Sequence, residues 1–447
     1  MKKIGMVSLG CPKNSVDTEF LLGDLVGRGY EITPNRKEAH VLIVNTCGFI
    51  ESATRESIDT ILEMGRLKTE GRCERLIVTG CLSERYTEEL LKEIPEIDHL
   101  LGVNQYPMIR EILASEAGSR RNQVNQPPQY FEASAPRLLT TPFYSAYLKI
   151  SEGCSNKCAF CIIPAMRGPM RSKPMDALLA EARKLAAKGV REFNLISQDT
   201  TMYGIDLRMK DGLARLLQEL AGIDGVDWLR LLYCYPTFIH PGLIDVIAGL
   251  DKVVKYIDVP LQHIHDEMLK RMKRQETEAG VRDMIAALQA KIPGVTLRTT
   301  FITGFPGETE AHFRHLREFI REIEFDHVGV FPYSDEEGTT AFHYPDKIDR
   351  AVAEARRDEL MQIQQAVSLK KNLARVGEVH PVLVEGPDES ESYLVTGRLP
   401  SQAPEIDGQV FIEQSNVEAG EIVPMRITGA AGYDLIATAE AAEELTA

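Results

Sequence analysis

Short apolar runs alternate with amphipathic stretches through roughly the first 115 residues. The apolar runs predict three buried strands, at Lys3–Leu9, Val41–Thr46 and Leu76–Thr79. The stretches that follow them have helical spacing, at Ser15–Val26, Ile50–Met64 and Glu84–Ile94. The polar residues of Asn14–Asp17 supply N-cap candidates for the first helix. Strands that alternate with helices in this way predict a parallel sheet.

The segment Ala117–Phe143 breaks this pattern with four prolines among polar residues, and it is predicted to be a linker. From Tyr144 the alternation resumes. Six further strands are expected at Tyr147–Ser151, Glu192–Ser197, Trp228–Tyr233, Tyr256–Val259, Thr296–Thr303 and His327–Tyr333. Six βα units predict an incomplete parallel barrel whose site lies at the carboxyl ends of the strands, closed by a long charged helix at about Arg350–Arg375.

The tail of the chain changes character. Short strand patterns separated by Gly, Pro and Asp turns occur at Glu378–Glu385, Ser392–Thr396, Gln409–Glu413 and Ile422–Thr428. They predict a small antiparallel β domain. The expected class is therefore α/β with a small β appendage. The expected divisions are an N-terminal domain at 1–116, a linker at 117–143, a core at 144–375 and a tail domain at 376–440.

Composition and charge narrow the possible functions. With 44% hydrophobic and 26% charged residues, the 447-residue chain is neither disordered throughout nor fibrous. It contains no uncharged apolar stretch of ~18 residues and no signal-peptide pattern at its start, so we expect a soluble cytoplasmic protein. Eight cysteines in a reducing compartment favour metal binding or catalysis over disulfides. The net charge of −15 weighs against a general nucleic-acid binder.

Three cysteines, Cys154, Cys158 and Cys161, lie within eight residues directly after a predicted strand. Closely spaced thiolates on one loop are typical ligands of an iron–sulfur cluster. Zinc is the alternative, but structural zinc sites usually have four protein ligands. The next candidates along the chain are Cys234 and His240, too distant for a local zinc knuckle. Three thiolates on a four-iron cluster leave one iron open to a small molecule.

This loop resembles the C-x3-C-x2-C signature of the radical S-adenosylmethionine (SAM) enzymes, and Phe160 matches the aromatic residue that usually precedes the third cysteine. The resemblance implies that the open iron of a 4Fe-4S cluster binds the amino and carboxylate groups of SAM. An electron from the cluster then cleaves SAM to a 5′-deoxyadenosyl radical. The cofactor performs the difficult chemistry, and the protein positions it and excludes water.

A second set of cysteines, Cys11, Cys47 and Cys81, is dispersed at intervals of 36 and 34 residues, about one βα unit each. Each follows a predicted strand of the N-terminal domain. Parallel strands place their carboxyl ends along one edge of a sheet, so the three thiols are expected to converge. A single buried cysteine is usually a packing residue, but three at one topological position favour a second cluster.

The sequences around these cysteines include Leu9–Asn14, Asn45–Ala53 and Thr79–Ser83, and they resemble the N-terminal domain of the radical SAM methylthiotransferases. The resemblance covers essentially the whole chain and implies a partial (βα)6 radical SAM core and a C-terminal TRAM β-barrel. It also implies two 4Fe-4S clusters and the insertion of a methylthio group into an unactivated C–H bond. The N-terminal cluster would hold or donate the sulfur, which a further SAM methylates.

Residues at the strand ends of the core are expected to bind SAM. Ser197 and Gln198 end one strand and suit the methionyl part or ribose, although an ordinary polar loop is an alternative. Thr303 and Gly304 open a segment that resembles the family's glycine-rich segment near the adenine. Arg298 is a candidate for the SAM carboxylate.

Other reactive or charged residues carry weaker signals. Lys157, Arg167 and Arg171 flank the cysteine loop and either balance the charge of the cluster or are solvated. His263 and His265 are interpreted as pocket or structural residues, because hydrogen abstraction by a radical requires no general base. For Cys73 packing is the better interpretation, and for Cys234 a chemical role has little support.

Acidic residues favour a ribosomal protein over tRNA as the expected substrate. Asp335, Glu336 and Glu337 stand where tRNA-modifying relatives tend to carry basic residues or proline, so the chain looks like the branch that modifies an aspartate β-carbon of small-subunit ribosomal protein twelve. From Gly377 to Ala447 there are 14 acidic and two basic residues, which disfavours RNA binding by the TRAM domain and suits a basic protein. A flavodoxin or ferredoxin is the expected electron donor. The alternatives are a tRNA adenosine methylthiotransferase and a two-cluster electron carrier.

Overall fold

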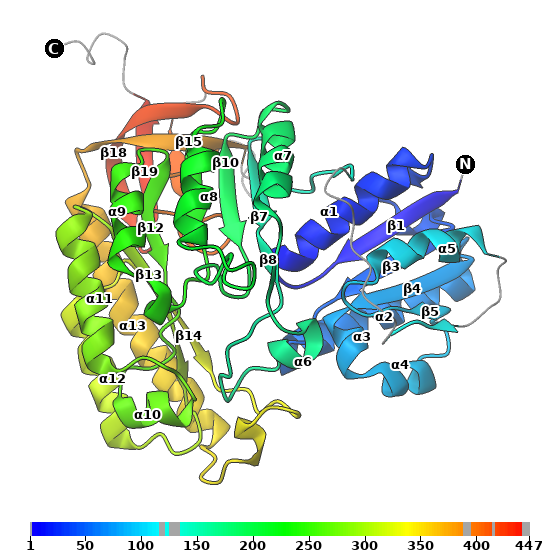
Figure 1. Ribbon diagram of the computed structural model, residues 1–447, viewed down its shortest axis with the longest axis horizontal. Coiled ribbons are helices and arrows are strands. Elements are labelled where there is room, and N and C mark those ends of the chain that lie inside the picture. The colour runs from blue at the N-terminus through cyan, green and yellow to red at the C-terminus, as the bar shows by residue number, and fades with distance from the viewer. Residues whose placement is uncertain (1, 116–120, 125–134, 388–394, 414–415, 440–447) are drawn as a thin grey trace. The chain divides into compact units, whose positions relative to one another are not determined.

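The computed structural model describes residues 2–115, 121–124, 135–387, 395–413 and 416–439 (Figure 1). The described chain forms two compact units. Unit 1 comprises Met1–Thr140, Tyr147–Glu181 and Glu336–Thr339, and unit 2 comprises Thr141–Ala146, Ala182–Asp335 and Thr340–Ala447. The segment that carries Cys154, Cys158 and Cys161 belongs to unit 1, together with the N-terminal residues.

The N-terminal part of unit 1 contains a six-stranded parallel sheet in the order β2-β1-β3-β4-β5-β6. Its strands are β1 (Lys3–Ser8), β2 (Glu31–Ile32), β3 (Val41–Thr46), β4 (Arg75–Gly80), β5 (His99–Leu100) and β6 (Arg121–Asn122). The helices between them are α1 (Pro12–Gly27), α2 (Glu51–Glu70), α3 (Cys81–Arg85), α4 (Thr87–Glu93) and α5 (Ile109–Ala114). The predicted parallel sheet is confirmed.

Strands β3 and β4 form the centre of this sheet, and every residue in them is buried. Their apolar sequences suit strands that are covered on both faces. In the register of the sheet, Asn45 pairs with Ser8 on one side and with Thr79 on the other. The carboxyl ends of β1, β3 and β4 are therefore level with one another, and the segments that leave them begin at the same edge.

Two local expectations for the N-terminal part were wrong. Helix α1 begins at Pro12 with Cys11 as its N-cap residue, because the fixed φ angle of proline suits the first turn, and not at the polar residues that follow. The helix expected at 84–94 is two helices, α3 and α4, divided at Tyr86, whose ψ angle of 41° is not helical.

The described end of the linker packs against α1. A Cβ atom on Gly23 would lie 2.3 Å from the carbonyl oxygen of Pro136, so this close approach requires glycine. Arg137 is buried and pairs with Glu19 of α1 and with Glu181 of α7 (Met175–Ala186). Pro127 and Pro128 lie outside the described residues.

The later segment of unit 1 carries the cysteine loop. Two short antiparallel strands, β8 (Ser151–Glu152) and β9 (Arg171–Ser172), pair at its base. Helix α6 (Ile163–Arg167) lies between them in sequence. The backbone N–H of Cys154 donates to Gly168 O (3.1 Å), which closes the loop.

The parallel sheet of unit 2 has the order β14-β13-β12-β11-β10-β7, and the first two residues of β7 (Ser145–Lys149) belong to this unit. The other strands are β10 (Glu192–Ile196), β11 (Trp228–Leu231), β12 (Val253–Asp258), β13 (Thr296–Thr303) and β14 (His327–Pro332). Helices α8 (Gly212–Ala221), α9 (Pro241–Gly249), α11 (Glu278–Lys291), α12 (Glu310–Ile323) and α13 (Arg350–Ala374) lie along the outer side of these strands (Figure 1). The six-stranded partial barrel is confirmed.

The tail folds into a closed five-stranded barrel, in the order β15-β16-β17-β19-β18. Its strands are β15 (Val379–Pro387), β16 (Val395–Arg398), β17 (Val410–Ile412), β18 (Ile422–Ala431) and β19 (Asp434–Ala439). The last strand was not expected, and it pairs with β17 in parallel, so the barrel is not wholly antiparallel. The acidic residues Asp388, Glu389, Glu391, Glu440, Glu443 and Glu444 lie outside the described residues.

Candidate functional site: two groups of cysteines

Cys11, Cys47 and Cys81 follow the level carboxyl ends of β1, β3 and β4. Cys11 is the N-cap residue of α1, Cys47 comes directly after β3, and Cys81 is the first residue of α3. Cys47 and Cys81 are buried, and Cys11 is half-buried. Gly10 has a φ angle of +91°, and a Cβ atom there would lie 2.9 Å from Cys47 Sγ. Only glycine therefore fits where the first cysteine loop meets the second.

The three thiols influence one another electrostatically. Burial, with a contribution from negative charge on Cys11 and Cys47, raises the pKa of Cys81 to about 12, although Arg167 opposes this shift. Burial also raises the pKa of Cys47, and negative charge on Cys11 adds to this increase. A raised pKa keeps the thiols of Cys47 and Cys81 protonated until a metal replaces the proton. A buried group of three sulfur donors fits an iron–sulfur cluster.

Two asparagines hold the cysteine loops together. Asn14 Nδ2 donates to Leu9 O (2.8 Å) and Thr46 O (3.0 Å), the carbonyls that lie shortly before Cys11 and Cys47. Asn45 Nδ2 donates in turn to Asn14 O (3.1 Å). Ser57 of α2 binds Cys47 twice, because its hydroxyl accepts from Cys47 N (3.0 Å) and donates to Cys47 O (2.8 Å).

The other three cysteines share the loop between β8 and α6. Cys154 is buried, and Cys158 and Cys161 are half-buried. The N–H of Cys161 donates to Cys158 O (3.2 Å), which turns the chain between these two cysteines. Gly153 has a φ angle of +76°, and a Cβ atom there would lie 2.4 Å from Pro169 O, so the entry to the loop requires glycine. Three sulfur donors on a tight loop fit a second cluster.

The residues that flank this loop differ in their surroundings. Lys157 is exposed, and Phe160, between the last two cysteines, is half-buried. Arg171 lies in β9 opposite Glu152. Arg167 is 2% exposed, so its guanidinium is not solvated.

Four of the expected SAM-binding residues lie at strand ends of unit 2. Ser197 and Gln198 follow β10, and the Ser197 hydroxyl accepts from Asp199 N (2.9 Å). Thr303 ends β13, and its hydroxyl donates to Ala353 O (2.9 Å). The Gly304 N–H donates to the carboxylate of Glu308 (3.1 Å). These contacts fix the shape of the 197–201 and 303–308 segments.

Comparisons with known proteins agree with this architecture. The model of the uncharacterized protein family UPF0004 matches residues 3–102, that of the radical SAM superfamily matches 148–320, and that of the TRAM domain matches 376–439. The chain is 49% identical to ribosomal protein uS12 methylthiotransferase RimO of Geotalea uraniireducens, over 97% of this chain and 98% of that protein. It is 51% identical to the RimO protein of Geobacter sulfurreducens, with the same coverage. The chain belongs to the RimO family.

Solved structures support the fold at low sequence identity. The radical SAM methyltransferase TsrM from Kitasatospora setae superposes with a TM-score of 0.55 at 14% identity, over 74% of this chain and 73% of that one. The cobalamin-dependent radical SAM enzyme OxsB gives a TM-score of 0.52 at 12% identity, over 82% of this chain and 56% of that one. Family membership makes the protein a radical SAM enzyme and a transferase. The names of the relatives match the ribosomal-protein hypothesis and not the tRNA or electron-carrier alternatives.

Arg298 differs from its expected role in this RimO-family chain. It lies near the start of β13, five residues before Thr303 at the carboxyl end. Its Nη1 is 2.9 Å from Asp258 Oδ1, and its Nε is 3.4 Å from Asp407 Oδ1 of the tail barrel. Both carboxylates pair with the guanidinium, and the proposed SAM site lies at the other, carboxyl end of the strand. This geometry argues against a contact with the SAM carboxylate and gives Arg298 a role in fastening the barrel to the core.

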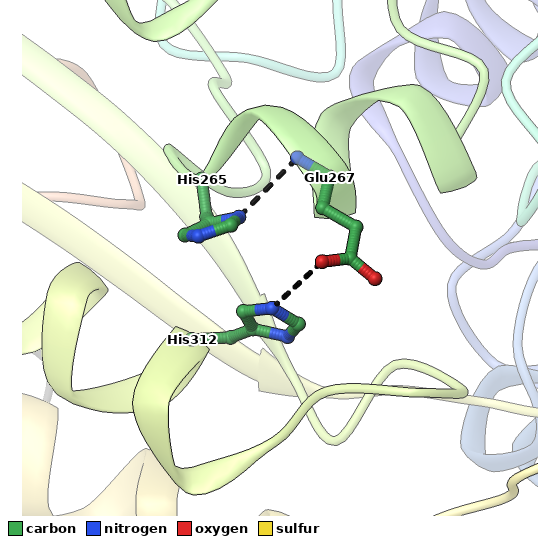
Figure 2. Close-up of side chains that lie close together, drawn as sticks. All are labelled: His265, Glu267 and His312. Atoms are coloured by element: carbon green, nitrogen blue, oxygen red, sulfur yellow. Dashed lines mark hydrogen bonds and ion pairs between the residues drawn. The ribbon is translucent and has the colours of Figure 1, made fainter.

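The histidines after β12 have structural roles. His265 is the N-cap residue of α10 (Asp266–Arg271), and its Nδ1 accepts from Glu267 N (3.2 Å). Figure 2 shows that the Glu267 carboxylate turns toward His312 of α12, whose Nε2 lies 3.3 Å away. His312 Nδ1 accepts from Thr309 N (3.2 Å).

These three residues place potential ligand atoms within 4.8 Å of one another. However, each neutral ring that accepts at Nδ1 carries its proton on Nε2. A metal at Nε2 would move that proton to Nδ1, against a backbone N–H that already points there. The group therefore caps two helices, and His263 is fully buried beside it.

The two remaining cysteines lie elsewhere. Cys73 belongs to the apolar core beneath the N-terminal sheet, and its thiol donates to Arg75 O (3.1 Å), which agrees with packing. Cys234 is buried after β11, and its N–H donates to Asp258 O (2.8 Å). Among the described residues, no helix is long and apolar enough to cross a membrane.

Several site residues carried no signal in the sequence. Asp17, Glu152 and Arg85 are charged residues of the kind usually found in solvent, yet their side chains are buried and paired with opposite charges. Their partners lie 3 to 251 residues away along the chain. The one local clue was Asn14, three residues after Cys11, which was interpreted as a helix cap.

Proposed function

We propose that this protein, a radical SAM enzyme of the RimO family, attaches a methylthio group to the β-carbon of an aspartate in ribosomal protein uS12. The observation that carries the proposal is the convergence of Cys11, Cys47 and Cys81 at one buried edge of the N-terminal sheet. A radical SAM core needs one cluster to cleave SAM, so a second group of three thiols indicates a further function, which is the supply of sulfur.

The two groups of cysteines have separate roles in this proposal. Cys154, Cys158 and Cys161 hold the core cluster, and Cys11, Cys47 and Cys81 hold the N-terminal one. When bound, the core cluster supplies the electron that cleaves SAM, and the N-terminal cluster supplies the sulfur. The chain's own contribution is to bury the thiols, to exclude water and to fix the loops through Asn14, Asn45 and Ser57.

The SAM pocket is proposed at the carboxyl ends of the strands of unit 2. Ser197 and Gln198 would bind the polar part of SAM, and the backbone of Thr303 and Gly304 would lie along the adenine. Phe160, next to Cys161, is proposed as a further SAM-binding residue. These assignments rest on strand-end positions, where parallel βα folds bind their ligands.

The tail barrel is proposed to recognise a basic protein. The barrel has two basic residues, and one of them, Arg398, is buried and paired with Glu192 and Glu385. The positive charge of Arg398 therefore does not offset the negative charge of the barrel surface. Such a surface repels phosphate backbones and steers a cationic partner. A low-potential flavodoxin or ferredoxin is the proposed electron donor. We expect the reaction in the cytoplasm, where ribosomal proteins are made.

The experiment that tests the proposal uses uS12 with deuterium on the β-carbons of its aspartates. Anaerobically reconstituted protein is incubated with SAM, a reductant and this substrate. We expect methylthiolated uS12 and deuterium in the 5′-deoxyadenosine produced. Modified uS12 without deuterium transfer would contradict the proposed carbon atom, and the absence of modification would contradict the proposed substrate.

A further inference from the structure

A buried network of charges joins the two cysteine groups inside unit 1. Arg167 Nη1 donates to Glu152 Oε1 (2.8 Å), two residues before Cys154, and its Nη2 donates to Asn14 Oδ1 (2.5 Å), three residues after Cys11. Lys149 pairs with Glu152 (2.7 Å) and with Asp17 of α1. These charged side chains are at most 10% exposed, so solvent screens the interactions weakly.

Arg167 is also the part of this network that faces the N-terminal cysteines. Met166, its neighbour in α6, packs against Cys81 and Val103. Arg167 itself donates to Asn14, whose Nδ2 donates to Leu9 O and Thr46 O, the carbonyls shortly before Cys11 and Cys47. Residues of the cysteine loop segment therefore approach the thiols of the N-terminal sheet.

The charges within the network already balance, with Asp17 and Glu152 against Lys149 and Arg167. Thiolates at Cys11 and Cys81 would add negative charge beyond this balance. The contacts of Arg167 with Asn14 and of Met166 with Cys81 hold the guanidinium beside these cysteines. A positive charge beside a cluster favours its reduced form, because reduction adds an electron, and hydrogen bonds to cluster sulfur act in the same direction.

We propose that Arg167 is a positioning residue for the N-terminal cluster. Its side chain holds the Cys11 and Cys81 loops against the Cys154 loop and raises the reduction potential of that cluster. This inference rests on the proposed function, since it requires a cluster on Cys11, Cys47 and Cys81. It adds that a residue of the radical SAM segment sets the redox properties of the sulfur-supplying centre.

The test uses the full chain with Cys154, Cys158 and Cys161 replaced by Ala, so that all bound iron belongs to the N-terminal group. In this parent, Arg167→Gln and Arg167→Lys are compared by iron content and by redox titration followed by electron paramagnetic resonance. The matched control is Arg137→Gln, because Arg137 is similarly buried and paired with two carboxylates, Glu19 and Glu181.

We expect Arg167→Gln to lower the ratio of reduced to oxidised cluster about tenfold at the parent's midpoint potential, which corresponds to about 59 mV for one electron. Arg167→Lys keeps the charge and should retain most of the parent's potential. Arg137→Gln should leave the potential unchanged. The double variant Arg167→Gln/Glu152→Gln also removes the carboxylate that loses its guanidinium partner, and it should show a smaller shift in the same direction.

An unchanged potential in Arg167→Gln and in the double variant would overturn the proposal. Equal loss of iron in all variants, Arg137→Gln included, would assign Arg167 to stability alone and would also overturn it. Failure of the parent itself to hold iron would instead contradict the proposed function, so the two failures are distinguishable.

Discussion

The carboxylate of Glu336 accepts from Arg85 Nη1 (2.8 Å), and both side chains are less than 10% exposed. The same carboxylate accepts from Glu51 N (3.0 Å) at the first turn of α2, where the helix dipole favours negative charge. Arg85 also donates to Gly48 O (2.9 Å). This ion pair therefore fixes the loop after Cys47 and the helix that begins at Cys81.

Replacement of Glu336 by Gln should loosen the N-terminal cysteine site. The substitution leaves Arg85 buried without its charge partner, and such a loss costs about 3–5 kcal/mol. We expect faster loss of N-terminal iron to a chelator and a lower unfolding midpoint. Glu337→Gln is the control, because Arg85 contacts the carbonyl of Glu337 and not its exposed side chain. Equal chelation rates in both variants would contradict this role.

Cys158→Ala should abolish cleavage of SAM. Two remaining thiolates on the loop cannot hold the cluster that supplies the electron. The measurement is the amount of 5′-deoxyadenosine formed with a chemical reductant. Cys73→Ala serves as the control, and it should retain cleavage with at most a modest packing cost, because Cys73 lies in the apolar core.

Cys47→Ala should separate the two activities. We expect cleavage of SAM to remain measurable, since the core loop is intact, whereas methylthiolation of uS12 should disappear. Both products are quantified in one reaction by mass spectrometry. Full methylthiolation by this variant would refute the assignment of the sulfur-supplying site.

Reversal of charge on the tail barrel should weaken the binding of uS12. Glu413 and Glu418 are exposed, and their replacement by Lys is expected to lower the affinity about tenfold at low ionic strength, or about 1.4 kcal/mol. The difference in affinity between the variant and the parent should shrink as salt is added, because the Debye length falls to ~8–10 Å. Glu219→Lys with Asp224→Lys makes the same change of charge on exposed residues at and just beyond the end of α8 and should have a smaller effect. Equal effects of both pairs would remove the barrel from substrate recognition.

The ion pairs of Glu192 should make stability depend on pH. Burial alone would raise the pKa of this carboxyl, but Arg398 and Arg230 lower it to about 2. A lowered pKa means that the stabilisation is present above the unfolded pKa of about 4.5 and is lost as the pH falls toward 2. Glu192→Gln should lower the free energy of unfolding by about 3–5 kcal/mol at neutral pH. The decline of that free energy below pH 4.5 should become shallower.

Chemical unfolding of cluster-free protein at several pH values measures this effect. The control is Asp227→Asn, because Asp227 and its partner Arg191 are each 37% exposed. An exposed pair contributes no more than about 1 kcal/mol, so this variant should follow the parent. A Glu192→Gln profile parallel to that of the parent would contradict the lowered pKa.

The sequence allowed the fold to be predicted where local pattern and burial coincide. The residues of β3 and β13 were predicted without error, because apolar runs or regular alternation mark a buried strand. The two-residue strands β2, β5 and β6 are too short to produce a pattern. Strand β19 was missed, since Asp434–Ala439 mixes small, polar and apolar residues and its pairing partners are set by closure of the barrel.

The cysteines of the site were predictable for a different reason. Their chemistry is rare, and their positions follow strand ends, which topology brings together. The environment of Arg167 was not predictable, because its contacts with Asn14 and Glu152 depend on how separate segments pack. Arg298 is the converse case, since its position on a strand of the core suggested a ligand contact, whereas the structure pairs it with Asp258 and Asp407.

The most direct test of the account is the intact mass of uS12 from cells that contain this protein and from cells that lack it. With the protein present, uS12 should gain one methylthio group in place of one hydrogen, and fragmentation should locate the group on an aspartate. In cells carrying Cys47→Ala the gain should be absent. An identical mass of uS12 in all three strains would contradict the proposed function.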